Sequence, residues 1–385
     1  MEFLGYRHRR EDGKFGVRNH VLVMASVCCA NGVVEAIGRA LPEVVTVTHA
    51  YGCGCGPDDL GVARRVLAGL IDNPNVGASL VIGLGCESLS SELLVQSAQS
   101  KPAEALVIQQ AGGSAATTAK GIEVATRLLK GLETQQRVVV PVSELVVGLE
   151  CGGSDAFSGV TANPAVGGAA DHFVREGATV ILAETTEMIG TAHILKRRCA
   201  TTELGEQVER LVNEQEKRVR ASLGELAGMV IAPGNIEGGL SSITEKSLGC
   251  ITKAGTTLIN EVVEYADCPS KRGLVIMDTP GYDIESMAGM AAGGAQIIIF
   301  TTGRGSTAGF PAVPVIKVSS NSQVYNKMPG DMDVNAGSII DEGRTIDEVG
   351  QEIFDLSIRV AGGEQTCDEI NRSAPFGYLK EGPTF

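Results

Sequence analysis

The chain alternates short runs of β-branched and other apolar residues with glycine-rich turns and segments of helical periodicity. In the first part of the chain, most of these runs lack the period-2 alternation of a strand with one face in water, so both faces are expected to be covered. Such strand–helix alternation predicts an α/β fold with mainly parallel sheets. These first runs cover residues 21–27, 44–50, 79–85 and 105–111, and the helical segments between them include 32–41 and 58–71.

The same pattern resumes after a polar stretch at residues 128–137. A chain of 385 residues is too long for one ordinary hydrophobic core. We therefore predict two Rossmann-like domains, residues 1–140 and 141–385, with the active site in the cleft between them. The later apolar runs cover residues 144–150, 178–184, 228–234, 273–281, 295–303 and 314–321, a charged segment at 203–222 is expected to be a solvated helix, and the tail from about 345 is expected to be helical.

The charge balance argues against two classes of partner. The formal net charge is −14 and aromatic residues make up 4% of the chain, with no Trp. Binding to nucleic acid or to an anionic membrane needs clustered Lys and Arg, and base stacking needs aromatic side chains. The chain has no apolar run of 18 residues and no signal-peptide pattern at its start, so a cytoplasmic location is expected.

Cysteines stand at three predicted strand ends, the edge where open parallel sheets bind ligands. Cys53 lies in THAYGCGCG, Cys86 in VIGLGCES and Cys151 in VVGLECGGSD. The chain has ten cysteines and no C-x-x-C pair, which fits neither a disulfide framework nor a zinc ribbon. Such thiols suit either a nucleophile activated by a base or a metal bound by several thiolates. Three or four thiolates favour iron, including an Fe–S cluster, and Cys250 is either a fourth ligand or a core residue.

Other strand ends are rich in carboxylates, which serve as general acid or base when they lie near a metal or in apolar surroundings. Glu184 and Glu187 occur in ETTEMIG, and Asp278 and Asp283 occur in MDTPGYD. DMDVNAG adds a further acidic turn. An acid at a strand end also commonly caps a helix or lies in a solvated turn, so the sequence leaves both interpretations open.

Three glycine-rich segments favour binding of an anion. GGSAATTAKG, which contains Ser114, places free N–H groups at the start of a predicted helix. TTGRGST sets Arg304 between glycines, where a guanidinium can clamp a carboxylate, and a third loop contains Lys246. None of the loops has a nucleotide-binding signature. The residues together predict a metal-assisted reaction on a small anionic molecule, and proton removal beside a carboxylate with loss of a β-hydroxyl describes a sugar-acid dehydratase.

The chain also resembles the altronate/galactarate dehydratase family of hydro-lyases along nearly its full length. The resemblance rests on GYRHRREDGKFGVRNH, NPNVGASLVIGLGCES, LVVGLECGGSDAFSGVTANPAVG, PGNIEGGLSSITEKSLG, MDTPGYD, FTTGRGS and DMDVNAG. It implies conversion of a sugar acid such as altronate or galactarate to a 2-keto-3-deoxy acid, with activation by ferrous iron or manganese. Single-chain members carry a small N-terminal domain, whereas this chain begins at GYRHRRED, which leads us to expect a large subunit that works with a separate small subunit or without one.

The resemblance also implies roles for individual residues. Cys53, Cys86 and Cys151 are expected to bind iron, as Fe²⁺ that Mn²⁺ can replace or as an Fe–S cluster. The other cysteines, apart from Cys250, are expected to be packing residues. His49, Glu150 or Glu187 is expected to move the proton. The residues expected to bind substrate are Ser114, Lys246 and Arg304, which would hold carboxylate, and Asp155 and Asn163, which would orient hydroxyls.

Two other functions remain open at this stage. A related branch resembles the large subunit of sulfolactate sulfo-lyase and eliminates sulfite in place of water, although the HAYGCGCG turn favours the dehydratases. A non-catalytic subunit that binds a sugar acid is the alternative from another class. A homo-oligomer is expected in each case.

Overall fold

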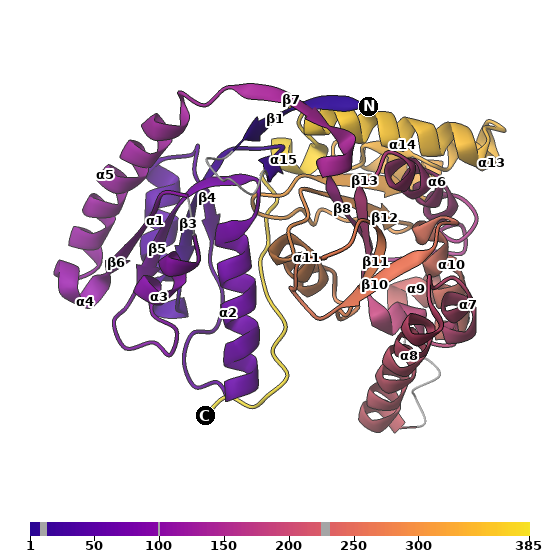
Figure 1. Cartoon of the computed structure of the whole chain (residues 1–385), viewed down its shortest axis with the longest axis horizontal. Coiled ribbons are helices and arrows are strands. Elements are labelled where there is room, and N and C mark those ends of the chain that lie inside the picture. The colour runs from indigo at the N-terminus through magenta and orange to yellow at the C-terminus, as the bar shows by residue number, and fades with distance from the viewer. Residues whose placement is uncertain (8–13, 99–100, 225–231) are drawn as a thin grey trace.

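Two parallel sheets organise the structure, and Figure 1 shows them side by side. The computed structural model describes residues 1–7, 14–98, 101–224 and 232–385. The first sheet has four strands in the order β4-β3-β5-β6, and every pairing within it is parallel. Its strands are β3 (His20–Ala25), β4 (Val45–Val47), β5 (Val76–Gly83) and β6 (Ala103–Val107). Its main helices are α1 (Asn31–Ala40), α2 (Pro57–Asp72) and α5 (Ser114–Leu132), with the short α3 (Ser91–Val95) and α4 (Ile108–Ala111).

The second sheet has seven strands in the order β10-β11-β9-β8-β12-β13-β14, again all parallel. Its strands are β8 (Val146–Cys151), β9 (Thr179–Leu182), β10 (Ile259–Val263), β11 (Gly273–Met277), β12 (Ile297–Thr302), β13 (Val315–Ser319) and β14 (Val334–Asn335). The helices of this part are α6 (Ala162–Arg175), α7 (Ala192–Arg197), α8 (Thr202–Leu223), α9 (Pro233–Glu237), α10 (Ile243–Cys250), α11 (Asp283–Ala292), α12 (Ser322–Lys327), α13 (Ser338–Asp341), α14 (Ile346–Ala361) and α15 (Cys367–Asn371). The parallel α/β fold predicted from the strand–helix alternation is confirmed.

A small antiparallel sheet, which the sequence did not predict, joins the start of the chain to the segment between the two large sheets. Its order is β2-β1-β7, with β1 (Glu2–Arg7), β2 (Phe15–Gly16) and β7 (Arg137–Pro141). β7 spans the predicted domain boundary near residue 140, and the division into two domains at that residue stays a prediction.

Helices α2 and α11 pack against each other between the two large sheets. Val66, Leu67 and Leu70 of α2 belong to the same buried cluster as Met287 and Met290 of α11. The helices approach so closely that a Cβ on Gly69 would lie 2.5 Å from the carbonyl oxygen of Ala292, so the site accepts only glycine. The two sheets therefore share one hydrophobic layer.

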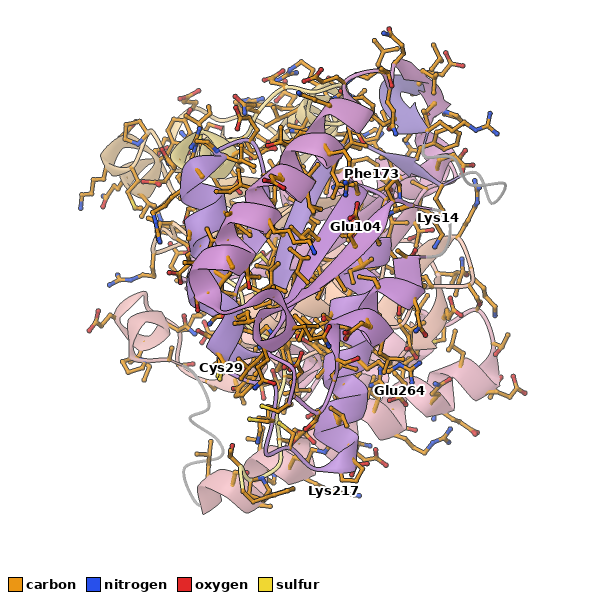
Figure 2. The ribbon with its side chains drawn as sticks, turned by 90° about the vertical axis from the view of Figure 1, so that its left-hand side faces the viewer. Lys14, Cys29, Glu104, Phe173, Lys217 and Glu264 are labelled. Atoms are coloured by element: carbon orange, nitrogen blue, oxygen red, sulfur yellow. The ribbon has the colours of Figure 1, made fainter. Side chains whose placement is uncertain are left out.

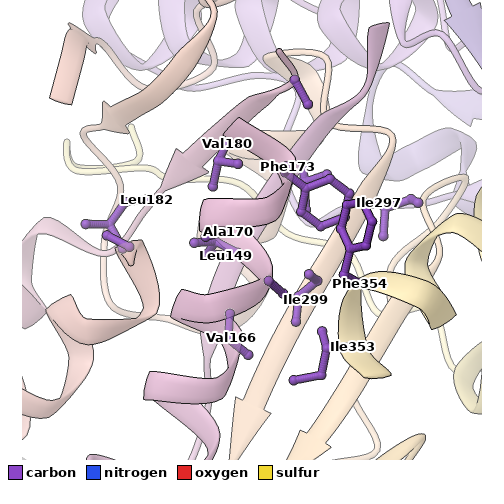
Figure 3. Packing of buried hydrophobic residues seen from close by; sticks show 14 of the residues in the cluster. Leu149, Val166, Ala170, Phe173, Val180, Leu182, Ile297, Ile299, Ile353 and Phe354 are labelled. Atoms are coloured by element: carbon purple, nitrogen blue, oxygen red, sulfur yellow. The ribbon is translucent and has the colours of Figure 1, made fainter. Parts of the chain in front are cut away.

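The opposite face of the seven-stranded sheet is covered by α6 and α14. Phe173 of α6 and Phe354 of α14 pack edge to face with ring centroids 4.8 Å apart, above Leu149 and Ile299 of the sheet (Figure 3). All four side chains are buried. Burial of apolar residues on both faces explains why β8 and β12 read as continuous apolar runs.

Most predicted elements agree with the observed ones to within a few residues, as α1, α2 and α8 show. The predicted strand at 105–111 is partly wrong, because residues 108–111 form α4. The predicted strand at 228–234 lies mainly outside the described residues, and its last two positions belong to α9. Among the residues that the structure describes, no helix combines the length and the apolar character needed to cross a bilayer.

Candidate functional site

The strand order of the seven-stranded sheet reverses between β8 and β12. From β8 the chain places β9, β10 and β11 on one side, with β10 at the edge and β11 between β10 and β9, and it later returns to place β12, β13 and β14 on the other side. The carboxyl ends of two strands that flank such a reversal form a crevice, where open α/β sheets bind ligands. β8 ends here with Glu150 and Cys151, and β12 ends beside them with Thr301 and Thr302.

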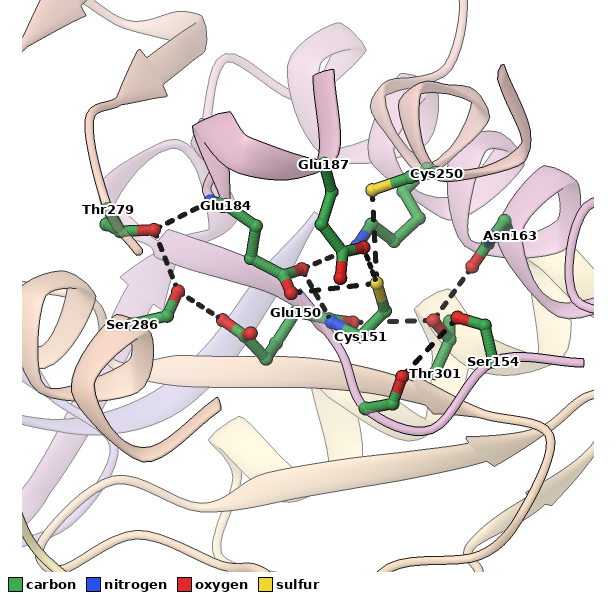
Figure 4. A network of polar contacts seen from close by, with 12 residues as sticks. Glu150, Cys151, Ser154, Asn163, Glu184, Glu187, Cys250, Thr279, Ser286 and Thr301 are labelled. Atoms are coloured by element: carbon green, nitrogen blue, oxygen red, sulfur yellow. Dashed lines mark hydrogen bonds and ion pairs between the residues drawn. The ribbon is translucent and has the colours of Figure 1, made fainter. Parts of the chain in front are cut away.

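A buried group of two thiols and two carboxylates lies in this crevice (Figure 4). Cys151 Sγ lies 2.7 Å from Glu187 Oε2, 3.7 Å from Glu184 Oε1 and 3.9 Å from Cys250 Sγ. The ligand atoms of Cys151, Glu184, Glu187 and Cys250, which we call the Cys–Glu group, all lie within 4.8 Å of one another. In the described part of the chain, no other group of at least three His, Cys, Asp or Glu side chains meets this distance.

Glu184 reaches the group through an unusual backbone conformation. Its φ of 65° and ψ of 61° place it in the left-handed region, which costs a non-glycine residue of order 1–3 kcal/mol. Its backbone N–H donates to Thr279 Oγ1 at 2.6 Å, and its carboxylate accepts from the backbone N–H of Cys151 at 2.8 Å. The turn after β9 is thereby held so that the carboxylate points at β8.

Two lysines, one fully buried and one nearly so, partly balance the acids. Lys253 Nζ donates to Glu184 Oε2 at 2.8 Å, and both side chains are fully buried. Lys246 Nζ forms an ion pair with Glu187 at the edge of the group. Burial opposes the ammonium form of both lysines, but the neighbouring acids and thiols outweigh it and raise the pKa of each.

The acids differ in their protonation. Burial, followed by the charges of Glu184 and Asp283, raises the pKa of Glu150 well above its usual value. Burial also works against ionisation of Glu187, yet the ammonium groups of Lys246 and Lys253 lower its pKa. Glu187 is therefore held as a carboxylate, whereas Glu150 is held as an acid.

The composition of the group fits a divalent metal of borderline softness. Thiolate and carboxylate ligands together suit ions such as Fe²⁺, Mn²⁺ or Zn²⁺. Contact with Cys250 and then burial raise the pKa of the Cys151 thiol, so this thiol stays protonated until a cation replaces its proton. Glu150 Oε1 is buried without a hydrogen-bond partner among the described residues, which adds an unused oxygen beside the group.

Two cavities contain most of the residues predicted to bind substrate, and the first of them adjoins the group. One, of about 260 Å³, is lined by Asp155, Asn163 and Lys246. The other, of about 360 Å³, shares Asp155 and adds Arg304. Lys246 therefore connects the first cavity to the Cys–Glu group, because its Nζ contacts Glu187.

Asp155 and Asn163 are held in place by the protein itself. Asp155 accepts hydrogen bonds from Ser158, from Ser320 at 2.7 Å and from Asn321 at 3.0 Å. The amide oxygen of Asn163 accepts from Thr301 at 2.8 Å. The prediction that they orient substrate hydroxyls remains a proposal.

Arg304 and Ser114 are exposed. Arg304 pairs with Glu237 at 2.9 Å across the mouth of its cavity, so a substrate carboxylate would compete with that partner. Ser114 opens α5 in the other sheet, in the turn after β6. Their predicted roles in substrate binding are not tested by this arrangement.

His49 lies under the turns of the four-stranded sheet with both ring nitrogens engaged. Its Nε2 is 3.0 Å from the carbonyl oxygen of Ala25, and its Nδ1 accepts from the backbone N–H of Tyr51 at 3.2 Å. Burial lowers its pKa, which favours the neutral ring. Its predicted part in proton transfer stays a prediction.

The structure places the predicted iron-binding trio in two environments. Cys151 is buried in the Cys–Glu group, whereas Cys53 and Cys86 are exposed in turns of the four-stranded sheet. Cys250, which the sequence left open between ligand and core, lies beside Cys151. The six cysteines expected to be packing residues do not lie in the core, because Cys28, Cys29 and Cys268 are exposed and Cys55, Cys199 and Cys367 are half-buried.

Sequence reasoning missed Lys253, which carries the buried ion pair. It also left Glu184 as one acid among several. The only available signal for Lys253 was its place three residues after Cys250, and one cation in a mixed segment does not identify a buried pair.

A third cavity, of about 530 Å³, opens between the two large sheets. The first turn of α2 lines one side, and Thr186, Asp278 and Thr279 line the other. Thr186 directly precedes Glu187 in the chain, and Thr279 Oγ1 accepts a hydrogen bond from the backbone N–H of Glu184. This cavity therefore also borders the Cys–Glu group.

Comparison with known proteins gives matches that cover nearly the whole of this chain. Residues 5–133 match the family described as "D-galactarate dehydratase/Altronate hydrolase, second domain", and residues 142–384 match "D-galactarate/Altronate dehydratase, C-terminal". Altronate dehydratase of Bacillus subtilis is 33% identical over 99% of this chain and 78% of its own length. Galactarate dehydratase (L-threo-forming) of Escherichia coli is 38% identical over 94% of this chain and 73% of its own length. The (2R)-sulfolactate sulfo-lyase subunit beta of Chromohalobacter salexigens is 33% identical over 95% of this chain and 94% of its own length.

The Lys253–Glu184 pair yields a stability prediction. Replacing Lys253 with Met leaves the buried Glu184 carboxylate without its cation, and such changes cost about 3–5 kcal/mol of unfolding free energy. Denaturant unfolding of the metal-free protein measures the loss. The matched control is Lys196→Met, which breaks the surface ion pair with Glu209 and should leave the unfolding midpoint nearly unchanged. Equal effects of the two substitutions would contradict the assignment.

The raised pKa of Asp283 predicts that the free energy of unfolding depends on pH. Burial, followed by the charge of Glu184, raises its pKa from 3.8 to about 7. The folded state therefore binds an extra proton between these values, and the free energy of unfolding contributed by Asp283 falls as pH rises through this window. Asp283→Asn should flatten that fall in urea unfolding of the metal-free protein between pH 4 and 7. Asp58→Asn, on an exposed site of α2, should retain the wild-type slope, and an unchanged slope in Asp283→Asn would disprove the prediction.

Proposed function

We propose that this chain, which belongs to the D-galactarate/altronate dehydratase family of hydro-lyases, removes water from a sugar acid such as altronate or galactarate to give a 2-keto-3-deoxy acid. Family membership rests on the two family matches and on relatives at 33–38% identity. The observation that carries the choice of site is the buried group of Cys151, Cys250, Glu184 and Glu187 beside the cavity lined by Lys246. We propose that the active site includes this cavity and reaches the cleft between the sheets.

We propose a single ferrous ion, replaceable by Mn²⁺, as the cofactor. Two thiols and two carboxylates favour a mononuclear site, because Fe–S clusters are usually held by cysteine alone. The ligand set that the contacts support is therefore Cys151, Cys250, Glu184 and Glu187, and the set of Cys53, Cys86 and Cys151 remains untested. When bound, the ion would supply Lewis-acid chemistry, polarising a substrate oxygen.

Lys246 is proposed to bind the substrate carboxylate. It lines the cavity, it is nearly buried, and its pKa is raised by Glu187, so it stays an ammonium group at neutral pH. Asp155 and Asn163 line the same cavity, and hydrogen bonds to Ser320 and Thr301 hold their side chains in place. Both would form hydrogen bonds with hydroxyl groups of the substrate. A carboxylate beside Lys246 would also lie beside the Cys–Glu group.

Glu187 is the proposed proton acceptor through Oε1, the oxygen paired with Lys246, while Oε2, which contacts Cys151 Sγ, is the oxygen proposed to bind the ion. Its lowered pKa keeps it ionised, and its contact with Lys246 places it next to the bound carboxylate, where the acidic C–H of the substrate lies. Glu150 has the opposite character, since its raised pKa keeps it protonated as a proton donor requires. Ser286 donates to Glu150 Oε2 at 2.6 Å and fixes its orientation. Substrate binding by Arg304 and Ser114 and proton transfer by His49 remain proposals, because no contact in the structure defines these roles.

A second candidate function is elimination of sulfite from a sulfolactate. The observation in its favour is the sulfo-lyase beta subunit, which this chain matches over 94% of that protein's length. Under this alternative, a separate small subunit would be a partner, and the same carboxylate-binding residues would serve. A homo-oligomer is proposed in either case.

The test is turnover of a small panel of acids. Anaerobically purified protein is supplied with Fe²⁺ and thiol, with and without a candidate small subunit, and offered altronate, galactarate or sulfolactate. A 2-keto acid from altronate or galactarate supports the dehydratase, whereas sulfite release supports the second candidate. A lack of turnover of all three under every condition would leave a sugar-acid-binding subunit as the function.

Removal of both thiols gives a specific prediction. The Cys151→Ser/Cys250→Ser variant should lose bound iron and lower kcat by at least about 10²-fold, because a Lewis acid typically supplies several kcal/mol of transition-state stabilisation. Iron content and turnover with the best substrate are measured together. Cys268→Ser, at an exposed site, is the matched control and should keep both. Retention of iron by the double variant would refute the ligand assignment.

A further inference from the structure

The hydroxyl of Thr279 lies between two acids of the candidate site. Thr279 follows β11 and is buried. Its Oγ1 accepts a hydrogen bond from the backbone N–H of Glu184 at 2.6 Å and lies 2.9 Å from Oγ of Ser286, which donates to Glu150 Oε2 at 2.6 Å. Figure 4 shows that these contacts form one continuous chain from Glu184 to Glu150.

The direction of each hydrogen bond follows from the protons that are available. A serine or threonine hydroxyl has one proton to donate and two lone pairs that accept. Ser286 gives its proton to Glu150, so Thr279 donates to Ser286 Oγ. Because an amide N–H only donates, Thr279 is the acceptor for Glu184. Thr279 therefore uses both its proton and a lone pair, and an aliphatic side chain supplies neither.

The chain of hydrogen bonds joins three strands that are neighbours in the seven-stranded sheet. The order β11-β9-β8 places the turn that contains Thr279 beside the turn that contains Glu184, and Glu150 lies at the end of β8. The backbone carbonyl of Thr279 reinforces the link, since it accepts from the N–H of Thr185 at 3.1 Å and from its Oγ1 at 3.0 Å. The end of β11 is thereby coupled to both acids.

Both acids need these hydrogen bonds, because all four residues of the chain are buried. Glu184 has a φ of 65°, and the bond to Thr279 satisfies the N–H of this strained residue. Glu150 Oε1 has no hydrogen-bond partner in the described part of the chain, so the bond from Ser286 to Oε2 orients the carboxyl group. Loss of either bond would leave a buried polar group unpaired and its side chain less restrained.

We propose that Thr279 is a positioning residue for the dehydration reaction, which sets Glu184 directly and Glu150 through Ser286. The inference rests on the proposed function, in which Glu184 is a ligand of the ion and Glu150 is the proton donor. Partners that hold a metal ligand by a hydrogen bond typically change metal affinity or activity by about 10–100-fold when they are replaced.

Thr279 lies apart from the residues proposed to hold the substrate. It lines the third cavity, as does Glu264, which Figure 2 labels. The cavity of Lys246 is lined by other residues, among them Asp155 and Asn163. Loss of the Thr279 hydroxyl should therefore lower kcat and leave KM unchanged.

Four variants of the full-length protein separate the two branches of the chain. Thr279→Val removes the hydroxyl at nearly constant shape, and Thr279→Ser keeps it. Ser286→Ala breaks only the branch to Glu150. Ser357→Ala is the matched control, because Ser357 is equally buried and its hydroxyl donates to a carbonyl of α14 at 2.8 Å, on the opposite face of the sheet.

Two quantities are measured for each variant: the affinity of the metal-free protein for Mn²⁺, and kcat and KM with the best substrate. Thr279→Val should lower kcat and weaken Mn²⁺ binding, each by about 10–100-fold, and Thr279→Ser should restore both. Ser286→Ala should lower kcat by at least about 10-fold but keep the wild-type affinity for Mn²⁺, because Thr279 still accepts from Glu184. Ser357→Ala should match the wild type in both quantities.

Wild-type kcat and Mn²⁺ affinity in Thr279→Val would overturn the proposal, and so would equal losses in Thr279→Val and Thr279→Ser. Circular dichroism and the unfolding midpoint verify folding. If Thr279→Val does not fold, Ser286→Ala decides, and an unchanged kcat or a weakened affinity for Mn²⁺ in that variant overturns the proposal.

Failure of the proposed function has a different signature. If the wild type turns over none of the acids, that function fails, and the Mn²⁺ affinities of Thr279→Val and Thr279→Ser then decide whether Thr279 positions Glu184. An unweakened affinity in Thr279→Val, or a wild type that binds no Mn²⁺, overturns the positioning role as well.

Discussion

The buried ion pair of Lys253 and Glu184 is the interaction on which the site depends. Both side chains are fully buried, and a charge in such surroundings is tolerated only with a partner in good geometry. The pair allows Glu184 to stay in a strained backbone conformation and to accept from the backbone N–H of Cys151. That hydrogen bond joins the turn after β9 to the end of β8. The crevice would otherwise hold acids and thiols with no cation deep within it.

The electrostatics of the group separate the roles of its acids. Lys246 and Lys253 hold Glu187 ionised, whereas burial keeps Glu150 protonated. Two carboxyl groups in one crevice are thus prepared for opposite proton transfers, which is the arrangement that elimination of water requires. The raised pKa of Cys151 couples metal binding to proton release, so occupancy of the site should depend on pH.

The two large sheets present cysteine at the same topological position. In each, the crevice lies where the strand order reverses, and in each a thiol follows one of the flanking strands. The surroundings differ, however. The second sheet buries its thiols with carboxylates and lysines, whereas Cys53 and Cys86 of the first sheet are exposed. The same topology therefore gives a mixed-ligand group in one sheet and exposed thiols in the other.

Much of the fold followed from the sequence, because local patterns determine local structure. Apolar runs without alternation predicted the buried parallel strands, and helical periodicity predicted α1, α2 and α8. The sequence also placed Glu150 and Cys151 at a strand end, as observed in β8. It did not predict the β1–β7 pairing, because that pairing joins residues more than 130 positions apart. Neither segment has a local sequence pattern that identifies the strand with which it pairs.

The sequence alone thus determined which side chains reach the carboxyl edges of the sheets. Only the tertiary structure decided which of them meet. Cys151 lies with Cys250 rather than with Cys53 or Cys86, because strand order and the position of α10 are set by long-range packing. The protonation of Glu150 and Glu187 was decided in the same way, since burial and the distance to a lysine are properties of the folded chain.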